Sequence, residues 1–392
     1  MRQKIRNRAF LITFLLLSVF FLLSNSHPTY EYAWAQAANG SNQLMRYSNN
    51  KKTPTPPVSI QKDKSLAVST GRYELIAGGD AIGIKIQTDG LVVVDTYHVN
   101  TDSGEVNPAK AAGIQKGDVI TAVNGKKIST VPEYKEQLLK SGDSKVLQLT
   151  VNRHGNMHRI DVQPVISHDG VVTTGLYLRD KLAGIGTLTY IDPHSHKYGA
   201  LGHEIIDQDT NQLVRIFQGE IIDSHVTSVR KAKSGKPGEK IADIIFDEHL
   251  GTLEKNNHFG IYGMMEVEGL SNRPTLPIAY MEEVKKGSAQ ILTVLEGNTI
   301  ESFNIEIIEV NPQTQKAVKG IKYMVTDKRL LEETGGIVQG MSGSPILQDG
   351  KIIGAVTHVL IHDSTLGYGI FIEWMLQESG IEYRGHQEKN AA

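Results

Sequence analysis

The chain has 392 residues, a formal net charge of −2 and no cysteine. This length accommodates two domains of ordinary size and a leader. The lack of cysteine excludes disulfides, thiolate catalysis and a cysteine-based metal site, and the absence of a long basic block argues against nucleic acid as a partner. Glycine is abundant, with 38 residues, which is typical of a β-rich protein with many tight turns.

Four basic residues precede an apolar run over residues 9–23. This order predicts an export signal whose basic end stays in the cytoplasm. The run is short for a membrane span of about 20 residues, but the nearest Ala-x-Ala cleavage sites lie well beyond its end. We therefore expect residues 1–30 to form an uncleaved or slowly released membrane anchor, with a cleaved signal as the alternative. In both cases the rest of the chain works outside the cytoplasm.

Two polar segments flank the folded part. Residues 31–66 are rich in Asn, Ser, Gln, Lys and Pro without apolar periodicity, and they predict a flexible linker. Residues 386–392 form a polar tail.

Short strand patterns begin near Val68 and continue to about residue 168, with an Ala-Gly-Ile-x-x-Gly-Asp motif, an Asn-Gly pair and a predicted helix at 131–140. This succession resembles a PDZ domain of bacterial proteases, which we assign to residues 67–168; an unrelated small β domain is the alternative. The resemblance implies a loop whose N–H groups receive the carboxylate of a peptide, beside a groove between a strand and the helix. The implied loop residues are Gly79, Asp80, Ala81, Ile82, Gly83 and Ile84.

Residues 169–385 keep the pattern of short strands separated by turn signals, which predicts a barrel or sandwich. The fold class is therefore mainly β, with a small α+β PDZ domain ahead of a β-rich domain. The expected strands cover residues 171–177, 183–190, 212–216, 221–229, 241–245, 260–263, 291–295 and 302–310.

Residues 335–346 read GGIVQGMSGSPI and lead from one apolar strand pattern into another. A Gly-x-Ser-Gly-x-Pro loop between strands is how a β-barrel serine protease presents its nucleophile, here Ser342. The glycines permit backbone conformations that other residues resist. The N–H groups of Gly340 and Ser342 can converge on the oxyanion of acyl transfer. An ordinary β-turn is the alternative.

A serine nucleophile needs a base within hydrogen-bond reach. His203 stands out among the histidines because it ends the segment YGALGH, whose glycines permit a constrained turn; a purely structural histidine is the alternative. His194 and His196, with His203, also suggest zinc. The surroundings of the first two predict an exposed turn instead, so we expect no metal and no other cofactor.

Asp327 is the candidate for the acid that orients the base. It follows an apolar strand pattern at 321–326 and precedes Ser342 by 15 residues, so a hairpin-like return could bring the two together. A helix N-cap is the structural alternative for this residue. Asp192 and Asp207 are the competing acids.

Residues 183–190, 198–203, 323–327 and 335–346, in this order, resemble the SpoIVB (stage IV sporulation protein B) peptidases over essentially the whole chain. The resemblance implies a histidine, aspartate and serine triad at His203, Asp327 and Ser342. The short spacing between aspartate and serine departs from chymotrypsin-like proteases, although the order of the triad is the same.

The resemblance also implies a biological setting and partners. The family acts between the mother-cell and forespore membranes, where it cuts a membrane-bound inhibitor resembling stage IV sporulation protein FA and so releases processing of a late sigma factor. A tethered protease meets its own linker at high effective concentration, so we expect autoproteolysis within residues 38–65. The alternatives are an envelope quality-control PDZ protease and a non-catalytic PDZ scaffold.

Overall fold

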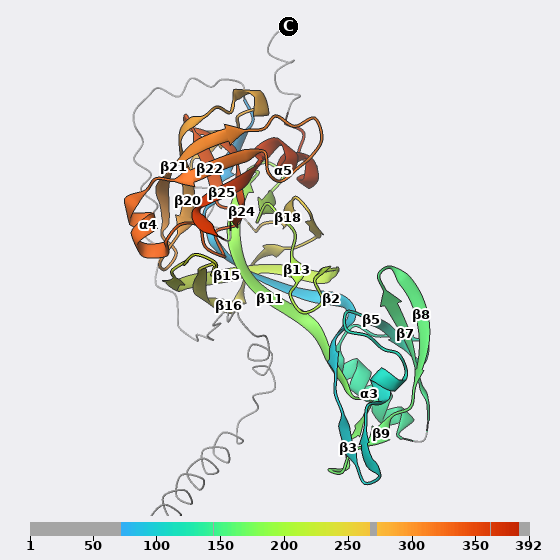
Figure 1. The fold of residues 1–392 in the computed structure, drawn as a ribbon. Helices are drawn as coiled ribbons and strands as arrows, with labels where there is room; N and C mark the ends of the chain where they lie inside the picture. The colour runs from blue at the N-terminus through green and yellow to red at the C-terminus, as the bar shows by residue number, and fades with distance from the viewer. Residues whose placement is uncertain (1–71, 144, 267–272, 361, 384–392) are drawn as a thin grey trace, which may run out of the picture. The chain divides into compact units, whose positions relative to one another are not determined.

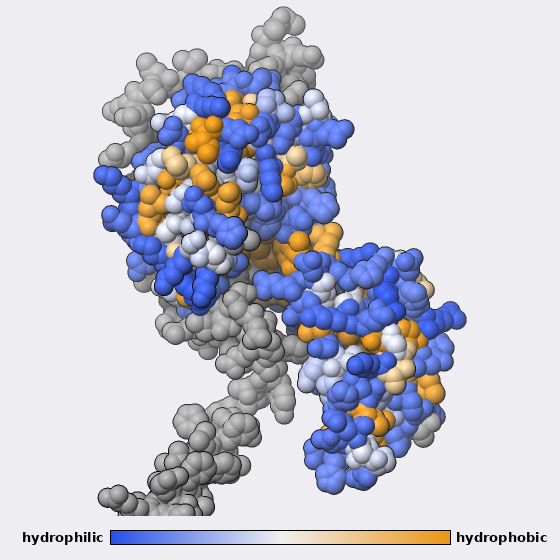
Figure 2. Space-filling model, viewed as in Figure 1, coloured by the Kyte–Doolittle hydropathy of each residue, from blue (hydrophilic) through white to orange (hydrophobic). Residues whose placement is uncertain are grey.

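The computed structural model describes residues 72–143, 145–266, 273–360 and 362–383 (Figure 1). The predicted anchor, the whole predicted linker and the polar tail lie outside these ranges. In the described ranges no helix is long and apolar enough to cross a membrane. Figure 2 shows a face that is hydrophilic over much of its area, with apolar residues in separate small groups.

The described residues form a mainly β fold, as predicted. The strands are β1 (Glu74–Ala77), β2 (Ala81–Thr96), β3 (Val99–Thr101), β4 (Gly104–Val106), β5 (Val119–Val123), β6 (Lys126–Lys127), β7 (Leu147–Arg153), β8 (Asn156–Val162), β9 (Val165–Ile166), β10 (Val172–Thr173), β11 (Leu176–Ile191), β12 (Lys197–Ala200), β13 (Ile206–Asp207), β14 (Gln212–Leu213), β15 (Ile216–Arg230), β16 (Glu239–Thr252), β17 (Lys255–Asn257), β18 (Gly260–Met264), β19 (Thr275–Pro277), β20 (Gly287–Val294), β21 (Ile300–Val310), β22 (Ile321–Val325), β23 (Pro345–Gln348), β24 (Lys351–Leu360) and β25 (Asp363–Phe371). The helices are α2 (Pro108–Ala111), α3 (Val131–Ser141), α4 (Lys328–Thr334) and α5 (Ile372–Ser379), with one 3-10 turn at Met281–Glu283.

The strands β2 and β11 each contribute to two hydrophobic cores. The first half of β2 places Ile82 and Ile84 in a core with residues of β11, β12, β15 and β18. Its second half places Leu91 and Val93 in another core, with residues of β5, β7 and α3. Gly90 marks the change between them: its φ is +107°, and an added Cβ would lie 2.7 Å from the Ile120 carbonyl oxygen. Only glycine permits the strand to continue past this contact.

The helix α3 confirms the helix predicted at 131–140. Its N-cap Thr130 accepts a hydrogen bond from the N–H of Glu133, and the Glu133 side chain accepts from the N–H of Thr130. This capping box satisfies two N–H groups that would otherwise be unpaired at the helix start. Tyr134 and Leu138 are one turn apart and both face the core, so this side of the helix packs on the sheet.

The C-terminal strands close into a barrel in the order β20, β21, β22, β25, β24 and β23. Its core contains Phe303, Tyr323 and Phe371, which are all fully or almost fully buried. The segment from α4 to β23 carries the Gly-x-Ser-Gly loop, so the closed barrel holds both ends of this loop in place.

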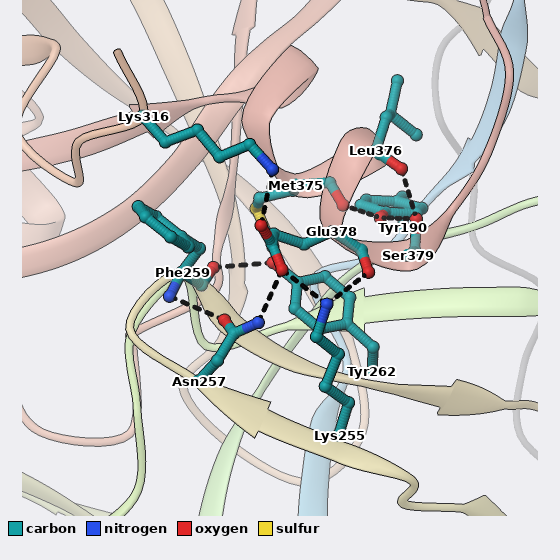
Figure 3. A network of polar contacts seen from close by, with 10 residues as sticks. All are labelled: Tyr190, Lys255, Asn257, Phe259, Tyr262, Lys316, Met375, Leu376, Glu378 and Ser379. Carbon is teal, nitrogen blue, oxygen red and sulfur yellow. Dashed lines mark hydrogen bonds and ion pairs between the residues drawn. The ribbon is translucent and has the colours of Figure 1, made fainter.

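A polar network joins the end of α5 to β17 (Figure 3). The Glu378 carboxylate accepts hydrogen bonds from Lys255 Nζ (2.5 Å), Lys316 Nζ (2.6 Å) and Asn257 Nδ2 (2.7 Å). Nearby, the Tyr190 hydroxyl donates to the Met375 carbonyl at 3.1 Å. Burial opposes ionisation of Glu378, but the two lysines prevail and hold the pKa of this carboxyl below its ordinary value.

We expect Glu378→Gln to lower the free energy of unfolding at neutral pH by about 1–3 kcal/mol, because two ammonium groups lose a charged partner. Since the folded-state pKa is depressed, this stabilisation is present above the unfolded pKa and is lost as the pH falls through the folded pKa. Urea unfolding at neutral and at acidic pH measures the effect. A difference between wild type and variant that stays the same at both pH values would contradict it.

Candidate active site

The nucleophile loop packs against β11 because glycine replaces a side chain at the contact. Gly340 and Gly343 have φ values of +91° and +93°. A Cβ on Gly343 would lie 2.1 Å from the carbonyl oxygen of Thr187 and 2.4 Å from the Leu201 nitrogen. The Ser342 hydroxyl donates to the Thr357 carbonyl on β24 at 3.2 Å. Ser342 therefore lies between β24 and the segment that leads to His203.

The backbone of the loop leaves two N–H groups available. The carbonyls of residues 339–342 accept hydrogen bonds, in order, from the Lys240 N–H, the Thr187 hydroxyl, the Ser344 N–H and the Thr187 N–H. In a trans peptide the N–H points away from the preceding carbonyl. Among the described residues, none accepts from the N–H of Gly340 or Ser342. This is the arrangement that an oxyanion hole requires.

His203 lies in a tight turn after β12. Leu201 and Gly202 both have positive φ, at +65° and +68°. A Cβ on Gly202 would lie 2.8 Å from Thr357 Cγ2, so the turn rests on the same residue that receives the Ser342 hydroxyl. Thr187 joins the two segments, because its carbonyl accepts from the Leu201 N–H at 3.3 Å while its own N–H donates to Ser342.

The tautomer of His203 follows from its partner. Its Nδ1 lies 2.8 Å from the carbonyl oxygen of Glu204. A carbonyl can only accept, so Nδ1 carries the hydrogen and Nε2 keeps a lone pair that can take a proton. The Glu204 side chain pairs with His258 at 3.1 Å. His203 thus has the tautomer of a general base, with a backbone carbonyl as the orienting group.

A second histidine, His358, lies beside His203 with their ring centroids 5.6 Å apart. Burial, then the neighbouring His203 and Lys319, lower the pKa of His358 to about 4. It is therefore neutral at neutral pH. The sequence offered His358 as one histidine among several, and no local motif marked it.

The segment that carries His203 and Ser342 matches a known peptidase family. The profile of the SpoIVB peptidase S55 family matches residues 170–376, more than half of the chain, and a PDZ domain profile matches residues 81–163. The chain belongs to the SpoIVB peptidase S55 family. It is a serine peptidase with a PDZ domain N-terminal to the peptidase segment, as the sequence predicted.

Individual proteins that resemble this S55 peptidase match it over short segments or with low sequence identity. A Haemophilus influenzae protein named "Probable periplasmic serine protease do/HhoA-like" is 33% identical over 89 residues, which cover 21% of this chain and 19% of that protein. The active form of the Rv3671c protease from M. tuberculosis is similar over 52% of this chain and 78% of its own, with 15% identity and a TM-score of 0.32. Its inactive form gives 16% identity and a TM-score of 0.29.

The structure of the S55 peptidase does not bring Asp327 to His203. Asp327 is the N-cap of α4: its carboxylate accepts from the N–H of Leu330 at 3.0 Å and of Asn304 at 3.3 Å. The role predicted for Asp327 in orienting the base stays a prediction, and in this conformation its carboxylate caps α4 instead. The physical reason is that an acid after a strand and before a helix satisfies the first turn of that helix.

The competing acids also have other partners. Asp192 accepts from the N–H groups of His194 and Ser195, so it stabilises the turn that holds His194 and His196. Asp207 pairs with Arg179. In the described part of the chain, no group of three or more His, Cys, Asp or Glu side chains could hold a metal ion.

The carboxylate loop assigned to residues 79–84 is wrong. The Gly79 N–H donates to the Leu188 carbonyl at 2.8 Å. From Ile82 to Gln87 β2 pairs on both edges, with Gly83 opposite Ile185 of β11 and Ile222 of β15. A peptide cannot add to a strand whose two edges are already paired. The residues corrected here are Gly79, Asp80, Ala81, Ile82, Gly83 and Ile84.

The predicted PDZ range 67–168 and peptidase range 169–385 contain the matched segments 81–163 and 170–376, and the strand pairing adds a detail to this division. The segment from β1 to the first half of β2 pairs with β11, β15 and β19, so it is part of the sheet that carries His203. The PDZ core begins at Leu91 and includes Leu178 of β11. The PDZ core is thus preceded in the chain by a short segment that pairs with strands of the peptidase.

The strand beside α3 is β11 rather than the start of β2. The Val131 N–H donates to the Asp180 carboxylate at 2.8 Å, and the hydroxyls of Tyr134 and Thr174 are 2.6 Å apart. Leu178 pairs with Val93 of β2 on one edge. Among the described strands, none pairs with the opposite edge of residues 176–180. In the described part of the chain, the strand edge that is unpaired and lies beside α3 is therefore that of residues 176–180.

The pH dependence of the peptidase should reflect the burial of His203. Burial, opposed by the Glu204 carbonyl, lowers the pKa of His203 below its ordinary 6.5. The base must be neutral, so the lower pKa keeps it active to lower pH. We expect the acid limb of kcat/KM to have its midpoint below 6.5, measured with a peptide substrate from about pH 4 to 9. A midpoint above 7 would contradict this environment.

Proposed function

We propose that this chain is an exported, membrane-tethered serine endopeptidase that cleaves a membrane-associated regulatory protein during sporulation. The observation that carries the proposal is the site itself: two available N–H groups in the Ser342 loop, and a correctly protonated His203 on the turn that meets the loop at Thr357. Family membership supports a protein substrate, and the N-terminal apolar run supports export and tethering.

The proposed reaction proceeds through an acyl-enzyme. The Ser342 hydroxyl turns from the Thr357 carbonyl toward His203, whose Nε2 takes its proton as the oxygen attacks the scissile carbonyl. The N–H groups of Gly340 and Ser342 stabilise the resulting oxyanion. His203 then protonates the leaving amine, and its Nδ1–H stays bonded to the Glu204 carbonyl. Water, deprotonated by His203, hydrolyses the ester and restores the enzyme.

The PDZ groove between β11 and α3 is proposed to hold a peptide of the substrate or of a partner by strand addition. The linker over residues 31–66 is the proposed site of self-cleavage, which would release the peptidase from its anchor. We further propose that the enzyme acts between the forespore and mother-cell membranes, with the membrane-bound inhibitor of sigma-factor processing as its substrate; membership of the SpoIVB family supports this setting.

Sporulating cells that carry the full chain, or its Ser342→Ala variant, test the proposal. We expect the wild type to yield linker fragments and fragments of the membrane-bound inhibitor, identified by peptide mapping, and the variant to yield neither. Equal fragments from both proteins would overturn it. Cleavage of many unrelated envelope proteins would favour a quality-control protease, and a wild-type protein that no fluorophosphonate probe labels would favour a scaffold.

A further inference from the structure

Lys240 is a buried cation that the proposed reaction does not use. It lies on β16 with 1% of its surface exposed. Its Nζ contacts two hydroxyls, Thr293 Oγ1 at 2.7 Å and Thr187 Oγ1 at 3.5 Å. Burial lowers the pKa of Lys240 to about 7, with no charged neighbour contributing. Burial disfavours the charged form of a lysine that has no carboxylate partner, so a fully buried lysine beside one loop points to a role there.

Lys240 lies beside the nucleophile loop, the Gly-x-Ser-Gly loop that carries Ser342. The Lys240 N–H donates to the Gln339 carbonyl at 2.9 Å. Its stem fills the space beside Gly340, where an added Cβ would lie 3.1–3.3 Å from Lys240 Cβ, Cγ and Cδ. The hydroxyl of Thr187, which Lys240 contacts, donates to the Gly340 carbonyl at 2.6 Å.

Two neighbouring side chains, those of Met341 and Glu239, do not support the nucleophile loop with a polar group. The residue before the nucleophile, Met341, is fully buried in the barrel core and brings no charge. Glu239, the next residue on β16, pairs with Arg230 at 2.5 Å, and adjacent strand residues point to opposite faces. Lys240 is thus the charged side chain that reaches under the loop from β16.

We propose that the Lys240 side chain is a positioning group for the oxyanion loop, because it supports the Thr187 hydroxyl that holds the Gly340 carbonyl. The backbone N–H of the same residue, which every variant keeps, holds the Gln339 carbonyl. The Gln339 carbonyl and the Gly340 N–H belong to one trans peptide and point in opposite directions. When the carbonyl is held toward β16, the N–H therefore points away from β16, where it can meet the developing oxyanion. The Lys240 side chain supports the Thr187 hydroxyl that holds the next carbonyl. This inference rests on the proposed function, because it assigns a role around Ser342 and Gly340.

The test measures the second-order rate at which a fluorophosphonate probe labels the full-length protein. Lys240→Met keeps the shape and removes the charge, Thr187→Val removes the hydroxyl, and Thr187→Ser keeps it. We expect the first two to slow labelling about 10- to 100-fold, as small misplacements of catalytic groups do, and Thr187→Ser to stay within about threefold of wild type. Thr227→Val on β15, whose hydroxyl donates to the Ile241 carbonyl, is the matched control and should label normally.

Thermal unfolding separates positioning from folding. Replacing a buried charge by an apolar isostere often leaves stability unchanged or raised. We therefore expect Lys240→Met to unfold at or above the wild-type temperature while it labels slowly. Labelling at the wild-type rate in Lys240→Met or Thr187→Val would overturn the inference, and so would a loss in Thr187→Ser equal to that in Thr187→Val. If Lys240→Met does not fold, the two Thr187 variants decide. Wild-type labelling that persists in Ser342→Ala would instead overturn the proposed function.

Discussion

Ser342→Ala should lower peptide turnover by about four to six orders of magnitude, which is the usual cost of losing the nucleophile of a triad. The Ser342 hydroxyl donates to the carbonyl of Thr357, the residue whose side chain lies against Gly202 in the His203 turn. Without it, only binding and the oxyanion N–H groups remain to accelerate the reaction. The kcat of the purified full-length protein with a peptide substrate measures the effect.

Ser344→Ala is the control within the same loop. Ser344 is fully buried, its N–H donates to the Met341 carbonyl, and its hydroxyl has no partner among the described residues. Alanine keeps this backbone bond, so turnover should stay within about tenfold of wild type. A Ser344→Ala protein as inactive as Ser342→Ala would show that the wrong serine was chosen.

The sequence was most informative where local chemistry determines the structure. The helix over 131–140 follows from its N-cap and apolar spacing, and α3 begins at Val131. The loop over 335–346 was found because glycine at special φ values leaves a readable pattern, and Gly340 and Gly343 adopt such values.

The parts that sequence reading missed depend on contacts distant in the chain. The carboxylate loop was misplaced because a glycine-rich loop before a strand looks the same whether the edges of that strand are free or paired. Gly83 lies between residues about 100 and 140 positions away, and no local pattern reports such partners. Lys240 was missed for a similar reason. A lysine in a strand is usually solvated, and its burial here depends on contacts with Thr187 and Thr293, which are about 53 positions away in the sequence.

The second large expected effect is the difference in kcat between variants of His203 and of Asp327. The family resemblance gives Asp327 the role of orienting the base, whereas in the structure Asp327 caps α4. His203→Ala should lower kcat by at least about four orders of magnitude, since it removes the base. Asp327→Ser should keep kcat within about tenfold of wild type, because serine can cap α4 as aspartate does. Asp327→Ala removes the cap and should lower the free energy of unfolding by about 1 kcal/mol.

Steady-state kinetics and urea unfolding of these three variants decide between the two roles of Asp327. A capping residue changes stability with little effect on kcat, and its serine variant behaves like the wild type. An acid that orients the base changes kcat strongly in both variants, whatever the stability. If Asp327→Ser is as inactive as His203→Ala, then His203 must exchange the Glu204 carbonyl for Asp327 when substrate binds. The backbone carbonyl would then orient the histidine only in the free enzyme, where it is 2.8 Å from Nδ1.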